Sequence, residues 1–393
     1  MSTRDILKAM KFPKGIRSIL ACVAVAVAAF GFYAYRGRVL YTVESMLPEG
    51  PSIVAEGVLR QDMQEADFKV VASGLEIPWE IAFLPDGGML VTERPGRLKR
   101  VAPDGRAAEI YGIDDVRDGG EGGLLGVAVH PKFEENGFVY LYRTVTASGA
   151  ARNRVDRYRL EAASLVERTT ILQNIPGAIY HDGGELAFGR DGKLYVTTGD
   201  ATQGALAQDL NSLAGKILRL NDDGTIPSDN PFGTAVWSYG HRNPQGLAWD
   251  GQGRLWAVEH GRSGVKSGLD ELNVIEPGQN YGWPSIEGDR EADGMRKPVV
   301  HSGATDTWAP GGMAFHADSL FFGGLRGEAL YQAKIDESPV TVISHFEKEF
   351  GRIRAVAIGP DKLLYFTTSN MDGRGAPRDG DDKIVRVNPR LFQ

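Results

Sequence analysis

A turn-and-strand pattern that recurs six times sets the strongest limit on what this chain can fold into. Each copy places an apolar residue before a turn with Asp-Gly or its equivalent, then continues as a strand with alternating apolar residues. The copies begin about 40 to 70 residues apart, a period typical of four-stranded propeller blades. They are FLPDGGMLVTERPGRLKRV from Phe83, VHPKFEENGFVYLYR from Val129, FGRDGKLYVTTGD from Phe188, AWDGQGRLWAVEHG from Ala248, FHADSLFFGGLRGEALYQA from Phe315 and IGPDKLLYFTTSN from Ile358.

A single four-stranded sheet cannot bury both of its faces, whereas a closed ring of sheets does so and leaves few exposed edges. The sequence therefore predicts an all-β fold, a six-bladed β-propeller of four-stranded antiparallel blades. GKILRLNDDG from Gly215 and DKIVRVNP from Asp382 alternate apolar and basic residues, as half-buried strands do. The 50 glycines supply many tight turns. A stacked β-sandwich is the alternative fold.

The N-terminus predicts export. Residues 18–35 carry no charge and follow five basic residues, the flank that stays cytoplasmic. The apolar run of about 18 residues reaches the length that spans a bilayer. We therefore expect a transmembrane or signal helix within residues 1–36, a linker over 37–64 and a propeller over 65–393. An uncleaved anchor places the chain in the periplasm on the inner membrane; cleavage after the small residues 26–29 makes it a soluble periplasmic protein.

The charge balance argues against a nucleic-acid partner. The chain has 44 Lys and Arg against 51 Asp and Glu, a formal net charge of −7. No basic surplus is therefore present to release counterions from phosphates. The single cysteine, Cys22, cannot form an internal disulfide and gives no evidence about the redox compartment.

One histidine stands in a loop that leads into the third repeat. His181 lies in YHDGGELAFG, followed by Asp182 and two glycines. An imidazole changes protonation near neutral pH, so it suits a general base that takes a proton from a hydroxyl. A turn histidine satisfied by local hydrogen bonds is the alternative.

Four arginines precede or follow the repeated strands. Arg242 stands with Asn243 and Gln245 in YGHRNPQGLAWD, directly before the strand of the fourth repeat. Strand arginines often face solvent, but propeller loops converge on one axis, and gathered guanidinium groups fit carboxylates. An acidic protein that gathers arginines at one mouth indicates a small polyanionic ligand. The other three are Arg326 in GGLRGEAL and the pair Arg352 and Arg354 in FGRIRAVAIGP.

Two further segments carry carboxylates on glycine-rich backbone. Residues 259–284 combine four acidic side chains, Glu271 among them, with exposed backbone, the oxygen ligands that calcium prefers. A solvated acidic loop is the alternative there. Glu121 is the one carboxylate of EGGLLGVAVHP, whose alternative interpretation is a simple turn before a blade. Trp308, in DTWAPGGMAFH, either lines an apolar slot or packs in the core.

Taken together and in this order, these motifs resemble the soluble pyrroloquinoline quinone (PQQ)-dependent sugar dehydrogenases, especially the aldose sugar dehydrogenase branch. The resemblance runs from about Asp67 to Pro389. It implies the same six-bladed propeller. Its motifs are EGGLLGVAVHP, HDGGELAFGRDGKLYVTTGD, GKILRLNDDGTIPSDNPF, GHRNPQGLAWD, EHG with DELN, NYGWP and GRIRAV.

The resemblance also implies roles for individual residues. His181 matches the base that takes the proton from the anomeric hydroxyl of an aldose while hydride passes to a quinone carbonyl carbon. Arg242 matches the arginine beside that carbonyl, where it stabilises the developing negative charge. The matching cofactor contacts are Asn243, Gln245, Arg352, Arg354 and Arg326, the last standing where glucose-specific members have lysine.

Metal and substrate contacts follow from the same resemblance. Gly261 and Arg262 match the backbone carbonyls that ligate the cofactor's calcium, and Glu271 with the Tyr281 carbonyl are candidates for a structural calcium. The candidate substrate contacts are Glu121, at a position that is commonly glutamine, with Asp182, Gln203 and Trp308.

These expectations combine into one prediction of function. The chain is expected to oxidise aldoses to lactones with PQQ and Ca²⁺ and to pass electrons to an external acceptor. A calcium-dependent sugar lactone hydrolase and a non-catalytic binding propeller are the alternatives. The motifs name neither the sugar nor the acceptor nor the oligomeric state.

Overall fold

The computed structural model describes residues 54–56, 67–113, 115–162, 164–264 and 267–392. The predicted export helix within residues 1–36 lies outside these residues, as does most of the predicted linker. No helix among the described residues combines the length and the apolar character needed to cross a bilayer.

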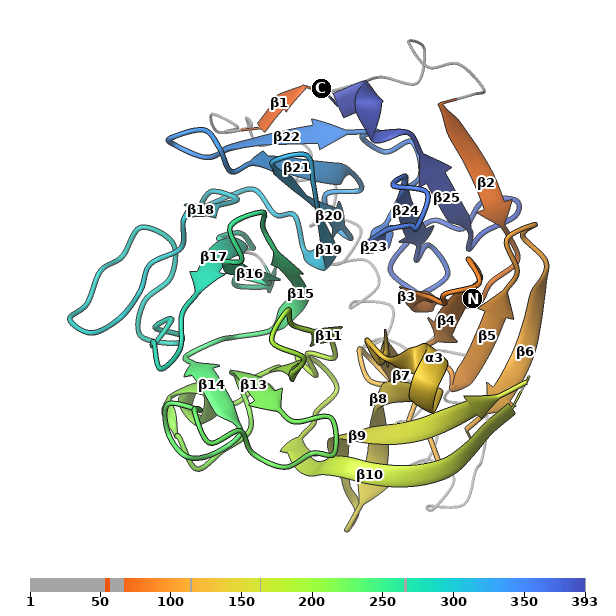
Figure 1. The fold of residues 1–393 in the computed structure, drawn as a ribbon. Coiled ribbons are helices and arrows are strands. Elements are labelled where there is room, and N and C mark those ends of the chain that lie inside the picture. Colours follow the sequence, from red (N-terminus) through yellow and green to blue (C-terminus); the bar gives the residue numbers. More distant parts are fainter. Residues whose placement is uncertain (1–53, 57–66, 114, 163, 265–266, 393) are drawn as a thin grey trace, which may run out of the picture. The chain divides into compact units, whose positions relative to one another are not determined.

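The described residues form six sheets arranged around a centre (Figure 1), five with four strands and one with five. From the innermost strand outwards, the sheets are β3 (Pro78–Phe83), β4 (Met89–Glu93), β5 (Arg97–Val101) and β6 (Ala107–Gly112); β7 (Leu124–Val129), β8 (Phe138–Ala147), β9 (Ala150–Glu161) and β10 (Ser164–Pro176); β11 (Leu186–Phe188), β12 (Leu194–Thr198), β13 (Lys216–Leu220) and β14 (Val236–Tyr239); β15 (Pro244–Trp249), β16 (Leu255–Glu259), β17 (Glu271–Ile275) and β18 (Val300–His301); β19 (Pro310–His316), β20 (Ser319–Gly324), β21 (Leu330–Lys334), β22 (Thr341–His345) and β1 (Val54–Glu56); and β23 (Ile353–Ile358), β24 (Leu364–Thr368), β25 (Ile384–Val387) and β2 (Phe68–Ala72). Three short helices of the described ranges, α3 (Phe133–Asn136), η2 (Gly204–Gln208) and η4 (Pro389–Phe392), lie in or after the connections.

The innermost strands close into a ring. β3, β7, β11, β15, β19 and β23 each contact the next in this order, and β23 contacts β3. The predicted repeats are the hairpins of the first two strands of the six sheets, β3–β4 through β23–β24. The six-bladed propeller is confirmed and the β-sandwich alternative is wrong.

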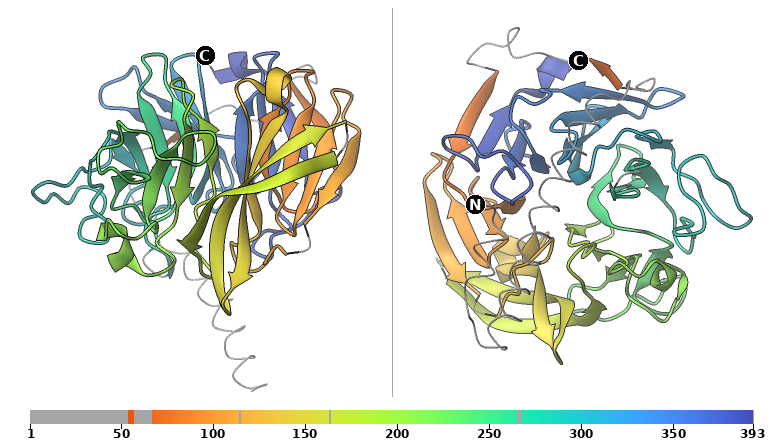
Figure 2. Two further views of the ribbon diagram at one scale, coloured as in Figure 1. Left: turned by 60° about the horizontal axis from the view of Figure 1, so that its bottom comes forward. Right: turned by 180° about the vertical axis from the view of Figure 1, so that it is seen from behind.

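The ring closes with strands from opposite ends of the sequence. β2 pairs with β25 in an antiparallel register, Phe68 opposite Val387, so the sixth blade combines early and late residues. Within the predicted linker, Val54–Glu56 form β1, which pairs in parallel with β22 and extends the fifth sheet. The free backbone groups of an edge strand accept such an added strand. Figure 2 shows the blades from the side and from behind.

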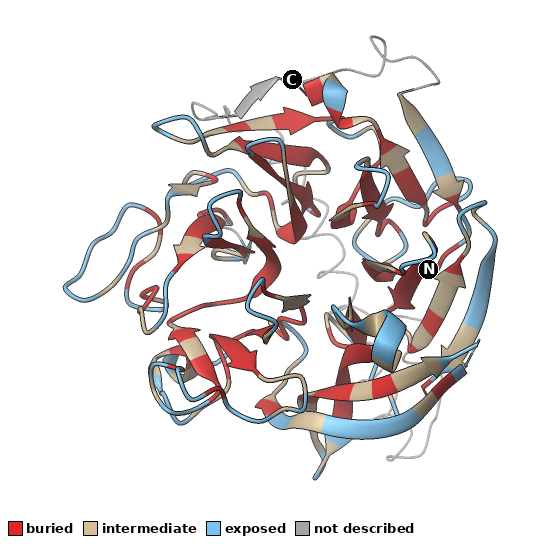
Figure 3. Ribbon diagram, viewed as in Figure 1, coloured by how far each residue is buried: buried red, intermediate tan, exposed pale blue. Residues whose placement is uncertain are grey.

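Packing between blades buries the second strand of each sheet more completely than alternation predicts. All residues of β4, β12, β16, β20 and β24 are buried, whereas β6 and β10 are largely exposed (Figure 3). The prediction of a half-buried strand in GKILRLNDDG is wrong, because every residue of β13 is buried. Lys216 Nζ there donates to the carbonyls of Leu206, Ala207 and Ala214 at 2.8, 3.0 and 2.6 Å.

Close backbone approach around the centre accounts for part of the glycine content. A Cβ on Gly311 of β19 would lie 2.3 Å from the Arg354 carbonyl oxygen of β23. A Cβ on Gly126 of β7 would lie 2.2 Å from the Gly184 carbonyl oxygen just before β11. Side chains of any size would therefore push neighbouring inner strands apart at these points.

Candidate active site

The predicted site residues gather at one end of the ring. In each blade the innermost strand is antiparallel to the second strand, so the start of the innermost strand lies beside the end of the second. The residues that precede the innermost strands therefore lie at the same end of the ring as the residues that follow the second strands. The innermost strands are β3, β7, β11, β15, β19 and β23, and the second strands are β4, β8, β12, β16, β20 and β24. A small pocket lies here, and its walls include Trp79, Glu121, Gln245, His260, Arg352 and Arg354. The propeller thus joins residues from distant repeats in one site.

His181 forms a pair with a buried carboxylate. Its Nδ1 lies 2.7 Å from Oδ1 of Asp200, the residue that follows the end of β12 by two positions. A carboxylate only accepts hydrogen bonds, so Nδ1 carries a hydrogen, and in the neutral form of the ring the lone pair is on Nε2. Asp200 also accepts from the Thr202 N–H at 2.7 Å and from Trp283 Nε1 at 2.8 Å. These contacts fix the ring with a basic nitrogen left over.

The His181 loop is held in a left-handed conformation by a second carboxylate. The φ of His181 is 64°, and its N–H donates to Glu121 Oε2 at 2.9 Å. Asn243 bridges the same region, because its Oδ1 accepts from the Gly183 N–H at 3.0 Å and its Nδ2 lies 3.4 Å from Glu121 Oε2. An ordinary residue at positive φ is strained, and these contacts hold it there.

Glu121 is ionised at neutral pH. Burial acts to raise the pKa of its carboxyl, but His260, the His181 N–H and the cation of Arg374 outweigh burial and leave the pKa lowered. The Arg374 Nη1 lies 3.3 Å from Glu121 Oε1. The carboxylate therefore presents negative charge and acceptor oxygens at the pocket wall.

Arg242 is buried and makes no ion pair among the described residues. Its Nη2 donates to Ser263 Oγ at 2.9 Å and its Nη1 lies 3.4 Å from the His260 carbonyl, while its Nε has no acceptor in the part of the chain that the structure describes. The guanidinium carbon lies 5.3 Å from the centre of the Trp283 ring. Burial lowers its pKa, yet an arginine remains charged at neutral pH.

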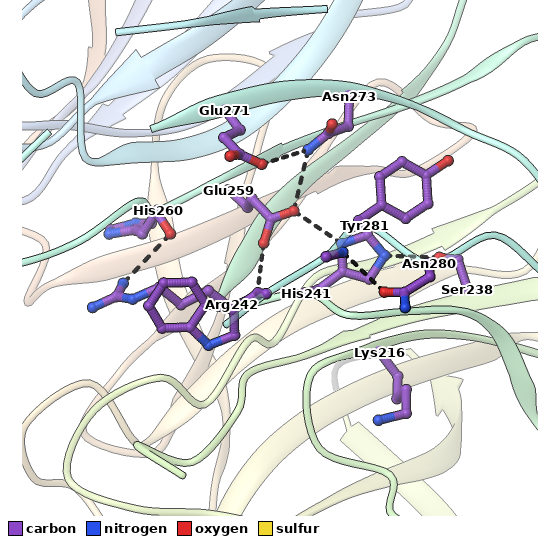
Figure 4. A network of polar contacts seen from close by, with 12 residues as sticks. Lys216, Ser238, His241, Arg242, Glu259, His260, Glu271, Asn273, Asn280 and Tyr281 are labelled. Atoms are coloured by element: carbon purple, nitrogen blue, oxygen red, sulfur yellow. Dashed lines mark hydrogen bonds and ion pairs between the residues drawn. The ribbon is translucent and has the colours of Figure 1, made fainter. Parts of the chain in front are cut away.

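A buried network behind Arg242 fixes its backbone (Figure 4). The Arg242 N–H donates to Glu259 Oε2 at 2.8 Å, and Glu259 Oε1 lies 2.9 Å from His241 Nδ1. Asn273 Nδ2 then joins Glu259 to Glu271 at 3.2 and 3.3 Å. The loop that carries Arg242 is thus anchored from β16 and β17.

Arg354 and Arg352 differ in their partners. Arg354 Nη1 donates to Gln245 Oε1 at 2.5 Å, and its guanidinium carbon lies 4.7 Å from the centre of the Trp79 ring. Burial lowers the pKa of Arg354 to about 10, so it remains charged at neutral pH without an ion pair among the described residues. Arg352 instead pairs with Asp372 Oδ2 at 2.7 Å through Nη2.

Four residues predicted to contact cofactor or substrate do not line the pocket. Arg326 and Gln203 are exposed, on the β20–β21 connection and before η2. Trp308 is buried in the core, 5.3 Å from the Phe322 ring centre, as its packing alternative predicted. Asp182 is buried beside His181, and burial raises the pKa of its carboxyl to about 6.

The candidate calcium ligands have backbone oxygens available. Neither the Gly261 nor the Tyr281 carbonyl accepts a hydrogen bond from any described residue, and the Arg262 carbonyl lies 3.3 Å from the Gly268 nitrogen. Glu271 accepts from the Gly288 N–H at 3.0 Å. Within the described ranges, no three His, Cys, Asp or Glu side chains cluster as a metal site.

Several residues at this end were missed as individual candidates. Asp200 and Trp283 lie inside the motifs VTTGD and NYGWP; Asp200 pairs with His181, and Trp283 donates to Asp200. His260 lines the pocket; its Nε2 lies 2.9 Å from the Pro310 carbonyl, and burial lowers its pKa to about 4. A usable signal existed for two of them, because Asp200 and His260 both follow the end of a second strand in the repeat.

Comparisons with known proteins agree with this site. The sequence model of the family described as glucose / sorbosone dehydrogenase matches residues 75–379. Aldose sugar dehydrogenase YliI of Escherichia coli is 33% identical, with 86% of this chain and 97% of that protein covered.

Solved structures show the same similarity. The PQQ-bound aldose sugar dehydrogenase of Streptomyces coelicolor is 40% identical, with a TM-score of 0.76 over 82% of this chain and 97% of that one. A putative oxidoreductase (glucose dehydrogenase) of Thermus thermophilus is 45% identical, with a TM-score of 0.76 over 81% of this chain and 99% of that one. This chain belongs to the glucose / sorbosone dehydrogenase family.

Proposed function

We propose that this chain is a PQQ- and calcium-dependent aldose dehydrogenase, which oxidises the anomeric carbon to a lactone and passes the electrons to an external acceptor. Its family and its aldose sugar dehydrogenase relatives support a sugar oxidoreductase. The observation that carries the proposal is a histidine held by a carboxylate beside a pocket lined by Arg354, a buried guanidinium without an ion pair among the described residues.

The unpaired buried donors in and near the pocket fit a planar ligand with several carboxylates. Arg354 and Arg242 make no ion pair among the described residues, and Arg242 Nε and Trp79 Nε1 are buried donors without acceptors. Leaving such donors unsatisfied costs about 1–3 kcal/mol each. An anionic ligand with many oxygens, such as PQQ, would satisfy them. Arg354, Gln245, Arg352 and Asn243 are the residues that would hold it.

When bound, PQQ supplies a quinone that accepts two electrons and hydrogen from the sugar carbon. His181 takes the proton of the anomeric hydroxyl on Nε2, and Asp200 stabilises the imidazolium that results. Arg242 stabilises negative charge that develops in front of its guanidinium. Glu121 accepts hydrogen bonds from sugar hydroxyls.

Calcium completes the proposed site. The Gly261 and Arg262 carbonyls would ligate it next to the cofactor, where a divalent cation withdraws electron density. Glu271 and the Tyr281 carbonyl would hold a second, structural ion. Export and an inner-membrane tether remain part of the proposal, on the basis of residues 1–36.

Reconstitution tests this assignment. Protein freed of metal and cofactor, then mixed with PQQ and Ca²⁺, should reduce an artificial dye in the presence of aldoses. His181→Ala should abolish the reduction while retaining the absorption of bound PQQ, and His316→Ala, at the far end of β19, should leave it unchanged. Full activity of His181→Ala would show that His181 is not the catalytic base. Lactone hydrolysis without dye reduction by any aldose points instead to a hydrolase.

A further inference from the structure

Two glutamates occupy the same position in two blades. PWEIAF in β3 and GGELAF at β11 align, which places Glu80 and Glu185 at matching points of the first inner strands. The blade between them has Gly126 at this point. Both side chains are buried, with exposed fractions of 6% and 7%. Charged residues are almost never buried unless they are paired or neutralised.

The carboxyl groups of Glu80 and Glu185 lie within reach of a hydrogen bond to each other. Glu80 Oε1 accepts from the Ile81 N–H at 2.8 Å, while Oε2 of Glu80 and Oε2 of Glu185 have no other donor within the described part of the chain. Two carboxylate oxygens attract each other only when a hydrogen lies between them. One shared proton satisfies both oxygens. The Ile81 N–H favours negative charge on Glu80, so Glu185 carries the proton.

Arg354 is the charged group that acts on both members of the pair. The other charged groups around Arg354 have partners of their own, in three ion pairs. A pair with one proton carries one negative charge, which balances the charge of Arg354. The three ion pairs are Arg94–Asp118, Arg352–Asp372 and Arg374–Glu121.

We propose that Glu80 and Glu185 form a proton-binding site that balances Arg354 in the free protein and takes up a second proton when a carboxylate ligand binds Arg354. The proton comes from solvent, and no bond other than its O–H bond forms. This inference rests on the proposed function, which supplies PQQ as the carboxylate ligand.

The electrostatics support the direction of this uptake. Burial raises the pKa of Glu185 well above its ordinary value, and Glu80 beside it raises the pKa further. Burial also raises the pKa of Glu80, while Arg354 acts to lower it for both groups. A ligand carboxylate on Arg354 cancels that lowering, so the remaining negative charge of the pair becomes more costly to keep.

Calorimetry with PQQ tests the uptake directly. Titrations of the full chain in buffers of different ionisation enthalpy give the number of protons bound per PQQ. Wild type should take up close to one proton more than Glu80→Gln/Glu185→Gln, and its affinity should fall by an extra factor of up to about ten per pH unit as pH rises. Glu109→Gln, which changes an exposed carboxyl on β6, should match wild type. Equal proton uptake in wild type and the double variant overturns the proposal.

Infrared spectroscopy gives a second readout that does not depend on activity. The carbonyl band of a buried protonated carboxylic acid should be present in the free wild-type protein, should grow on PQQ binding and should be missing from Glu80→Gln/Glu185→Gln. Its absence from the wild type overturns the shared proton, even if the double variant fails to fold. Failure of PQQ to bind at all overturns the proposed function instead, and the band in the free protein still tests the pair.

Discussion

Asp200→Asn should disable the His181 base without removing the cofactor site. The carboxylate accepts three hydrogen bonds, from His181 Nδ1 at 2.7 Å, the Thr202 N–H at 2.7 Å and Trp283 Nε1 at 2.8 Å. Asparagine has one oxygen. If that oxygen faces His181, its NH₂ group faces the Trp283 donor; if it faces Trp283, its NH₂ group faces His181 and Thr202. At least one donor is left unpaired either way.

The size of the effect follows from the lost charge. A hydrogen bond to a charged group contributes about 1.5–3 kcal/mol, and tenfold in rate corresponds to about 1.4 kcal/mol. We therefore expect kcat to fall roughly 10- to 150-fold. The free energy of unfolding should fall by about 1–3 kcal/mol, because one buried donor lacks an acceptor.

Dye reduction by protein reconstituted with PQQ and Ca²⁺ measures kcat, and the absorption of bound PQQ measures occupancy. Asp191→Asn is the matched control, because Asp191 lies in the turn at the other end of the same β11–β12 hairpin. That control should retain wild-type kcat. A value for Asp200→Asn within twofold of wild type, with PQQ bound, would show that the carboxylate does not support the base.

Three other changes test separate parts of the structure. Arg354→Gln should weaken PQQ binding about 10- to 150-fold, because a buried charge-assisted contact contributes about 1.5–3 kcal/mol; unchanged binding in a titration followed by absorbance would contradict this. Burial lowers the pKa of His345 to about 4 in the folded protein, whereas the pKa of histidine in the unfolded chain is about 6.5. Between these two pH values the unfolded chain binds more protons than the folded one, so the free energy of unfolding decreases as pH falls. Denaturant titrations should show this loss, up to about 3 kcal/mol, and His345→Gln should reduce it. Chelation of calcium should lower the Tm of the wild type, and the same chelator should lower the Tm of Glu271→Gln by less; an equal shift in both would exclude Glu271 as a ligand.

The fold could be predicted from the sequence because each blade contains the same turn between its first two strands. Asp-Gly turns and their equivalents mark each first hairpin, so six copies predicted six sheets. The burial of Lys216 was not accessible in this way, since its three carbonyl acceptors come from the connection that includes η2. The alternation of apolar and polar residues within one strand does not show which neighbouring segments cover that strand.

For the site, the sequence predicted candidate residues by their chemical type but not the contacts between them. His181 and Arg242 were found by their chemistry, and Arg354 by its place on a strand. Asp200 was missed, since an aspartate after a strand is common and its partner lies 19 residues away. Trp308 was placed with the substrate, yet its side chain packs against Phe322, a contact that depends on the exact course of two strands.

Pairing of β2 with β25 has a consequence for biosynthesis. A growing chain that has produced β3 through β24 still holds an open arc, with the edge of β24 exposed until Ile384–Val387 emerge. Unpaired edges invite association with other chains. Completion of this protein should therefore be a late, nearly all-or-none event, and truncations before Ile384 should accumulate as aggregates rather than as smaller folded proteins.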